Sequence, residues 1–435
     1  MTEQPDPAAT SFRKALGPGI LFAGAAIGVS HLVQSTTAGA VYGLALVPLV
    51  LMSHLFKYPA MVFGPRYAAA TGRSLPDAYR EQGWLSWTVF AAITLGTMFT
   101  IQAAVTIVTA ALVGTYLLEP ILGEAPQLWV TSAGLLAVAA ALNCIGGYGL
   151  LDRLLKILMV ILLVSTIWAA ASQAPAVLRS FDEVRVAPWV TDPAWILFAV
   201  ALVGWMPAPL DITAWNSLWT LERARQTGST PTRKHSELDF RIGYGLCVVT
   251  AVSFVVLGAG VLYLNGEAPA EGAGPFATQL VGLYSDSMGD WARPLIVTCA
   301  IAVMLSTTLT VFDAIPRTCA AIAGAAAPRR LGTERMRRPL YWLFLVLVGV
   351  GAVALIGLFA GKNQFRALVN LATTLSFLGT PVIAWLNHRA ITSPAVPEQD
   401  RPGRGLRVFS LVCVGVWSAF AAYYLWTLVA DTVPS

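Results

Sequence analysis

The chain has 435 residues, of which 56% are hydrophobic and only 12% are charged. An ordinary soluble domain carries about 25% charged residues, so this composition excludes one and indicates a multi-spanning membrane protein. The net charge of +5 resides in loops between apolar segments, so it does not indicate a nucleic-acid partner. The five cysteines form no CxxC pair, and neither a disulfide framework nor a zinc site is predicted.

Apolar runs of spanning length recur along the whole chain and predict an all-α membrane protein with eleven transmembrane helices. They cover residues 16–44, 46–65, 86–117, 127–147, 154–173, 192–219, 241–265, 292–323, 339–360, 365–387 and 408–430. Their spacing suggests two five-helix halves and one extra helix. The expected parts are a tail (1–15), a first repeat (16–175), a second repeat (190–388), and a loop with the eleventh helix (389–435).

The first apolar run contains a polar stretch at membrane depth. Its members are Gly28, Ser30, His31, Gln34, Ser35, Thr36 and Thr37. Polar groups in lipid are costly, so this stretch should face protein or a water-filled cavity. Irregular backbone is tolerated at that depth only in such places. We therefore predict a broken helix, with one half near residues 16–27 and the other near residues 32–42.

The sixth run carries a second interruption, where Pro207 and Pro209 follow Trp205 and Met206. A proline removes a backbone donor and clashes with the preceding helical turn. Two interrupted hydrophobic segments at matching positions in two halves of a chain indicate a transporter binding site.

Loop charges predict the orientation of the chain. If the N-terminus is cytoplasmic, the inner connections hold most of the arginines and lysines, whereas the outer ones hold only Arg179, Arg185, Arg293, Lys362 and Arg366. The positive-inside rule then places the N-terminus in the cytoplasm and, with eleven spans, the C-terminus outside. We expect an integral protein of a bacterial inner membrane, with the lipid bilayer as its surroundings.

Several short motifs resemble those of the Nramp family of divalent-metal transporters. These are Leu16-Gly17-Pro18-Gly19, the stretch from Ala38 to Gly43, the Met206-Pro207 pair, and the residues from Phe377 to Pro381. The resemblance implies a leucine-transporter-like fold, in which two inverted repeats of five helices enclose the substrate between broken spans one and six. It also implies proton-coupled import of a metal such as Mn²⁺ or Fe²⁺, no enzymatic activity and no cofactor.

The chain departs from this family at the residues that would bind the metal. The family's Asp-Pro-Gly-Asn motif falls on Gly28-Val29-Ser30-His31, so its aspartate is replaced by Gly28 and its asparagine by His31. The methionine of span six is kept as Met206. Span three lacks the family's acidic residues, so we expect weak or no proton coupling by the usual family route.

The candidate metal ligands are therefore His31, Met206 and Asp211. Imidazole and thioether groups suit transition metals. A carboxylate supplies the hard anionic oxygen that a divalent ion favours. Each has a structural alternative: His31 could hydrogen-bond a freed carbonyl, Met206 could be packing, and Asp211 could cap the helix that follows the break.

Two other groups of charged residues lie inside apolar runs. Asp313 and Arg317 are four residues apart, which favours a local ion pair and leaves a coupling or gating role as the alternative. Lys57, near His54, is expected to extend toward the cytoplasmic face, as lysine side chains do near helix ends.

A second substrate class fits the same residues. A small organic solute, such as an amino acid or carboxylate, could occupy a cavity bounded by Gly28, Ser30, His31, Gln34, Trp205 and Met206. A substrate carboxylate would then lie at a half-helix N-terminus. A non-transporting sensor is disfavoured because the loops are short. The partner is thus a divalent metal ion or a small molecule.

Overall fold

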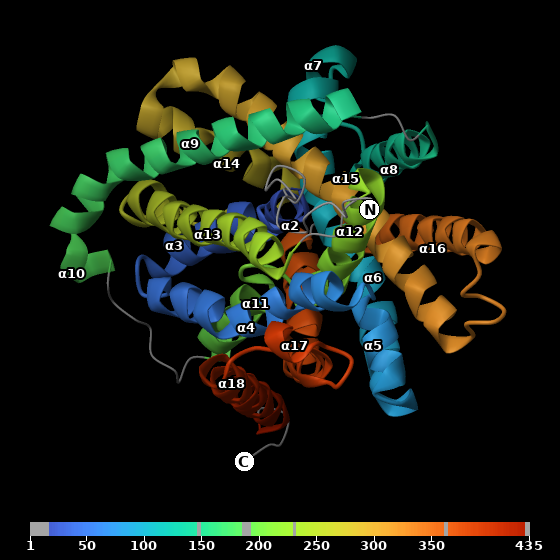
Figure 1. Cartoon of the computed structure of the whole chain (residues 1–435). Coiled ribbons are helices and arrows are strands. Elements are labelled where there is room, and N and C mark those ends of the chain that lie inside the picture. The colour runs from blue at the N-terminus through green and yellow to red at the C-terminus, as the bar shows by residue number, and fades with distance from the viewer. Residues whose placement is uncertain (1–16, 146–148, 185–192, 229–231, 361–363, 431–435) are drawn as a thin grey trace, which may run out of the picture.

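The computed structural model describes residues 17–145, 149–184, 193–228, 232–360 and 364–430, and these residues form helices joined by short connections (Figure 1). The predicted tail, residues 1–15, lies outside the described residues. The described residues contain no β-strand, so the prediction of an all-α protein is confirmed.

The first half contains a broken first helix and four long helices. Its elements are α2 (Pro18–Ala26), η2 (Ser30–Ser35), α3 (Thr36–Tyr42), α4 (Val47–Thr71), α5 (Leu75–Glu81), α6 (Trp84–Val113), η3 (Gly114–Leu118), α7 (Glu119–Leu122), α8 (Leu128–Ile145), α9 (Gly149–Arg179) and α10 (Phe181–Val184). Both η2 and η3 are single π-helical turns.

The second half begins with another interrupted helix. Its elements are α11 (Pro193–Trp205), α12 (Ile212–Thr227), α13 (Arg233–Leu257), η4 (Gly258–Tyr263), α14 (Ala273–Met288), η5 (Asp290–Ala292), α15 (Arg293–Ala326), α16 (Glu334–Ala360), α17 (Phe365–Thr392), η6 (Glu398–Asp400) and α18 (Arg404–Ala430). Both predicted breaks are present in the described chain.

Eight helices within the described residues are long and apolar enough to span a membrane, and the bent pair of α2 with η2 and α3 makes a ninth. Shorter apolar helices lie in the fourth and sixth predicted runs, at Leu128–Cys144 and Trp195–Trp205. Every predicted run therefore contains a helix, although the number of eleven spans stays a prediction.

Burial separates central helices from peripheral ones. In the span that contains α6, 72% of the most apolar 18-residue stretch is buried inside the protein. In α16, only 22% of the corresponding stretch is buried. Figure 1 shows α6, α11 and α12 toward the middle of the bundle, with α16 and α18 at its edges. Beyond the arginines of its first turns, the large side chains that α16 leaves exposed are apolar, as a lipid-facing helix requires.

Two glycine pairs bring helix backbones together. A Cβ on Gly19 would collide with the Asp239 carbonyl of α13, and a Cβ on Gly243 would collide with the Gly19 carbonyl. Gly39 of α3 and Gly258 of η4 meet in the same reciprocal way. Small residues at helix contacts permit this close approach in membranes. The two halves of the first span are thus each packed onto α13 or its extension.

The start of α2 is capped by a residue from another helix. Gly17 precedes α2 and has no side chain, so it cannot cap the free N–H groups of the first turn. The Asp239 carboxylate of α13 accepts hydrogen bonds from the backbone N–H of Gly19 at 2.6 Å and of Gly17 at 3.3 Å. This contact fixes the N-terminal end of α2 against α13.

Candidate functional site

The two helix breaks lie beside each other in the centre of the bundle. The first falls at residues 27–29, where the chain bends by 44° between α2 and η2. The second spans residues 206–211, between α11 and α12. The Ser30 hydroxyl oxygen at the first break lies 3.4 Å from the Pro207 carbonyl oxygen at the second and 2.7 Å from the Ala26 carbonyl oxygen of its own segment. The structure therefore brings together the two segments that the sequence singles out.

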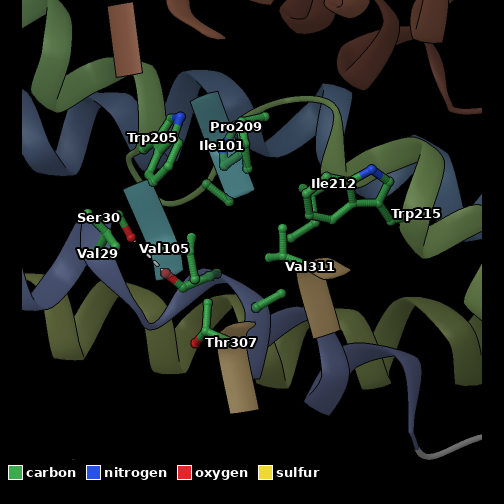
Figure 2. A pocket seen from close by; sticks show the side chains of 13 residues that line it. Val29, Ser30, Ile101, Val105, Trp205, Pro209, Ile212, Trp215, Thr307 and Val311 are labelled. Carbon is green, nitrogen blue, oxygen red and sulfur yellow. Dashed lines mark hydrogen bonds between the residues drawn. The ribbon is translucent and has the colours of Figure 1, made fainter. Parts of the chain in front are cut away.

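A small enclosed space separates the breaks. Its volume is about 20 Å³, which is enough for a single water molecule. It is lined by side chains from both breaks, α6, α12 and α15: Ala25, Ala26, Val29, Ser30, Ile101, Val105, Trp205, Ala208, Pro209, Ile212, Trp215, Thr307 and Val311 (Figure 2). Only the hydroxyls of Ser30 and Thr307 and the indole N–H groups of the two tryptophans are polar.

Among the predicted site residues, Ser30 and Trp205 line this space. The Trp205 indole N–H donates to the Ser376 hydroxyl of α17 at 2.9 Å, which holds the ring in place. Gly28 packs against Thr307, whose Cγ2 would lie 2.9 Å from an added Cβ. The Gln34 amide donates to Asn370 of α17 at 3.3 Å. Gly28 and Gln34 border the break without lining the space.

His31 is fully buried and engages protein groups at both ring nitrogens. Its Nε2 lies 3.0 Å from the Cys247 carbonyl of α13. Its Nδ1 lies 2.7 Å from the Ser30 hydroxyl and 3.0 Å from the Ala26 carbonyl. A neutral imidazole that donates from Nε2 to Cys247 can accept at Nδ1 from Ser30. In this conformation the ring bridges the first break to α13, and metal binding by His31 stays a prediction.

Met206 is also fully buried, in an apolar cluster with Tyr42, Leu202 and Val255 among its members. It does not line the central space. Within the described residues, no three or more His, Cys, Asp or Glu side chains are grouped to hold a metal ion. Metal binding by His31, Met206 and Asp211 together stays a prediction.

Asp211 has an unusual environment. Only 3% of the residue is exposed, and within the described chain neither carboxylate oxygen has a hydrogen-bond partner. The nearby Thr97 hydroxyl donates instead to the Ile93 carbonyl, at 2.9 Å. The interpretation of Asp211 as a helix cap is wrong, because its side chain accepts no hydrogen bond from the first turn of α12. Its chain neighbour Ile212 lines the central space, whereas Asp211 itself does not.

Residues on α4 satisfy the backbone carbonyls at the second break. The Lys57 ammonium donates to the carbonyls of Val203, Gly204 and Ala208 at 2.6, 2.8 and 3.2 Å. The Ser53 hydroxyl donates to the Met206 carbonyl at 2.6 Å. The expectation that Lys57 extends toward the cytoplasmic face is wrong, because its side chain is fully buried against these carbonyls.

Several residues of the site were not singled out from the sequence. Ile101, Val105 and Val311 are ordinary apolar residues of long helices, and no local pattern distinguishes them. Lys57 did carry a signal, since a lysine within an apolar run needs a partner. The helix break after Trp205 frees backbone carbonyls that can accept from such a lysine. The two features together indicate the contact between Lys57 and the second break.

Asp313 and Arg317 form the predicted ion pair on α15, with 2.6 Å between Oδ2 and Nε. Tyr341 of α16 donates to the other carboxylate oxygen at 2.8 Å. The Arg317 side chain is 41% exposed, and partly exposed pairs contribute little to stability.

We expect Asp313→Asn to change the rate of substrate uptake less than about twofold and the free energy of unfolding by less than about 1 kcal/mol. Uptake in liposomes and thermal unfolding would measure both, and a complete loss of uptake with intact folding would instead assign the pair a coupling role.

A family model described as natural resistance-associated macrophage protein-like, or Nramp, matches residues 19–427. An uncharacterized protein of Pasteurella multocida (strain Pm70) is 34% identical over 380 residues, which cover 86% of this chain and 84% of that protein. The comparison therefore extends over nearly the whole chain.

Solved structures share the fold. A mutant of the manganese transporter of Eremococcus coleocola superposes with a TM-score of 0.68 at 14% identity, covering 100% of this chain and 91% of that one. Mhp1, a nucleobase-cation-symport-1 family transporter in a closed conformation, superposes with a TM-score of 0.56 at 16% identity, covering 99% and 97%. The leucine-transporter-like fold predicted from the sequence is thereby confirmed. The chain is an integral membrane transporter rather than an enzyme, and it belongs to the Nramp family.

Proposed function

We propose that this protein moves a divalent metal cation of the Mn²⁺ or Fe²⁺ type across the membrane by alternating access. The observation that carries the proposal is the Asp211 carboxylate, which is buried beside the two breaks with neither oxygen hydrogen-bonded in the described chain. A buried carboxylate without hydrogen-bond donors is costly, and the nearby Lys57 ammonium attracts it without forming a hydrogen bond to it. Divalent cations favour such oxygens, so a metal ion passing between the breaks would find its anionic ligand here.

Family membership and the manganese transporter of Eremococcus coleocola support the same cargo. The space between the breaks holds about one water in this conformation, so a metal site requires the half-helices to move apart. His31 and Met206 are the proposed further ligands, and each would first have to leave its present contacts. Gly28, Ser30, Gln34 and Trp205 are the proposed surroundings of the bound ion.

Contacts on two sides of the breaks close this conformation. Gln34 of η2 binds Asn370 of α17 near one end of the bundle. Asn387 of α17 donates to Thr213 of α12 at 3.1 Å and accepts from the Tyr79 hydroxyl of α5. With the N-terminus in the cytoplasm and the C-terminus outside, the first contact faces outward and the second inward. Alternating access would open one while the other remains closed.

Proton coupling by the usual family route is proposed to be weak or absent. The centrally placed helix α6 carries threonines and Gln102 but no acidic or basic residue over Trp84–Val113. A proton relay through this helix would lack titratable side chains. Uptake should therefore proceed without matching acidification of the vesicle interior.

The test is Mn²⁺ entry into liposomes that contain the purified protein, read by an internal metal-quenched dye alongside an internal pH dye. We expect saturable quenching, absent from empty liposomes, with little change of internal pH. Uptake by wild-type protein that acidifies the vesicles in proportion would contradict the coupling proposal. Folded protein with no uptake of Mn²⁺ or Fe²⁺ under any gradient would contradict the metal proposal.

The apolar lining of the central space favours a second candidate. Trp205 and Trp215 face it together with aliphatic side chains, and its polar groups are few (Figure 2). Pockets for small organic ligands have this composition. The alternative cargo is a small amino acid or carboxylate. Thermal stabilisation by such a solute, with no response to Mn²⁺, would favour it over the metal.

A further inference from the structure

The carbonyl oxygens around Lys57 form a cage at the end of α11. Val203 and Gly204 lie in the last turn of that helix, where carbonyls lack the usual helical partners, and only the Met206 N–H donates to the Val203 carbonyl, at 3.3 Å, among the described backbone groups. Ala208 lies across the break, and its carbonyl joins the other two around the same ammonium. A helix C-terminus also carries partial negative charge, so this position attracts a cation.

The neighbouring carbonyls at the break are occupied by hydroxyls rather than by a charge. The Ser53 hydroxyl donates to the Met206 carbonyl at 2.6 Å, and the Ser30 hydroxyl oxygen lies 3.4 Å from the Pro207 carbonyl oxygen. Lys57 is thus the sole cation that contacts the break within the described chain. Its side chain has no exposed surface, so it is held there and not in water.

A negative charge balances the ammonium. Asp211 is buried in the same region, and it attracts Lys57 electrostatically, although no hydrogen bond joins them. A buried charge without a partner is strongly destabilising. If the ammonium were removed, the carbonyl cage and Asp211 would together leave an uncompensated negative site.

We propose that the Lys57 ammonium is a tethered cation: it fills a monovalent-cation site formed by the carbonyls of Val203, Gly204 and Ala208. Half-helix C-termini and unwound carbonyls hold free coupling ions in transporters with broken helices. Here the chain supplies the cation itself, so no free ion is needed at this break. Lys57 is not one of the proposed metal ligands, although its counter-charge Asp211 is, and the occupation of the carbonyl cage does not depend on the cargo.

The size of the cage identifies the class of ion. The distances of 2.6–3.2 Å from nitrogen to oxygen suit an ammonium or a potassium ion. Calcium requires oxygens at about 2.3–2.6 Å and magnesium at about 2.0–2.1 Å, so the cage is too wide for divalent ions. Emptied of the side chain, it should accept K⁺ or a small alkylammonium ion and should not respond to Mg²⁺ or Ca²⁺.

The experiment is thermal unfolding of the purified full-length protein in choline chloride, with K⁺, n-propylammonium or Mg²⁺ added. Lys57→Ala removes the atoms that n-propylammonium would restore. We expect a lower unfolding midpoint for this variant in choline, with a saturable recovery of about 2–4 °C or more in K⁺ or n-propylammonium and none in Mg²⁺. The wild-type midpoint should not change between these salts.

Two control variants separate the cage from general effects. Lys234→Ala removes an exposed lysine from the first turn of α13 and should leave every midpoint unchanged. Ser53→Ala removes the hydrogen bond to the Met206 carbonyl but leaves the Lys57 ammonium in place. The unfolding midpoint of this variant should be lower than that of the wild type and should not change when K⁺ is added. A folded Lys57→Ala protein that ignores both K⁺ and n-propylammonium would overturn the proposal, as would equal stabilisation of the wild type.

If Lys57→Ala does not fold in any salt, Lys57→Gln decides the question. Its amide donates hydrogen bonds but carries no charge. A Gln variant as stable as the wild type in choline, or less stable but indifferent to K⁺, would overturn the proposal. A less stable Gln variant that recovers in K⁺ supports it. Because unfolding is the readout, the result stands whether or not Mn²⁺ is transported.

Discussion

Asp211→Asn is expected to reduce saturable Mn²⁺ uptake by at least about tenfold. The substitution keeps the size of the side chain but removes the sole negative charge beside the two breaks within the described residues. An interaction with a charged group contributes about 1.5–3 kcal/mol. Losing it should weaken metal binding about tenfold to hundredfold. Initial rates of Mn²⁺ entry over a concentration series would show whether the half-saturating concentration, the maximal rate or both change.

Asp211→Asn removes no hydrogen bond from the described structure, but it also removes the charge that balances the buried Lys57 ammonium, so uptake is compared per folded protein and the unfolding midpoint is measured alongside. Asp313→Asn is the matched control, because it removes a carboxylate from another helix of the same bundle. It should leave uptake close to the wild-type value. Wild-type kinetics in Asp211→Asn would remove the carboxylate from the proposed site and leave the organic solute as the better candidate.

Gly243→Ala is expected to cause a large loss of folded protein. The new Cβ would collide with the Gly19 carbonyl, which is backbone and cannot rotate away. Overpacking costs about 1–3 kcal/mol even where side chains can adjust, so the upper part of this range applies. The separation of α2 from α13 would also weaken the bonds from Gly17 and Gly19 to Asp239. The unfolding midpoint and the monodisperse yield after solubilisation would measure the effect.

Gly245→Ala is the control on the same helix. A Cβ at this position meets nothing within 4 Å, and alanine is a better helix former than glycine by up to about 1 kcal/mol. This variant should be as stable as the wild type or slightly more so. Equal loss in both variants would show that α13 is sensitive to any added methyl group and would contradict the role of the close backbone contact.

The sequence predicts the helices and the breaks well because both depend on local composition. Residues 16–44 contain a polar stretch inside an apolar run, and Pro207 and Pro209 interrupt another, so the two breaks follow from single segments. The predicted halves near residues 16–27 and 32–42 correspond to α2 and to η2 with α3. The same reasoning places Asp313 and Arg317 together, since a four-residue spacing fixes their geometry on one helix.

The site is less predictable because its contacts join distant segments. The Lys57 ammonium meets carbonyls about 150 positions later, and backbone carbonyls leave no mark in the sequence. Asp211 follows a break and precedes a helix, which is the usual position of a cap, yet tertiary packing turns its side chain away from the first turn. The direction of a side chain at an irregular segment is set by its neighbours in space, and these were unknown.

The cap that Asp239 provides for α2 also bears on how the chain is assembled during synthesis. The first-turn N–H groups of α2 are made early, whereas the carboxylate that accepts from Gly17 and Gly19 emerges more than two hundred residues later. Until Asp239 has been made, the N-terminal end of α2 lacks this acceptor for its Gly17 and Gly19 N–H groups. We therefore expect the N-terminal end of α2 to reach its final packing only after α13 has been made, and a ribosome-bound nascent chain that stops before residue 239 should leave it accessible to aqueous reagents.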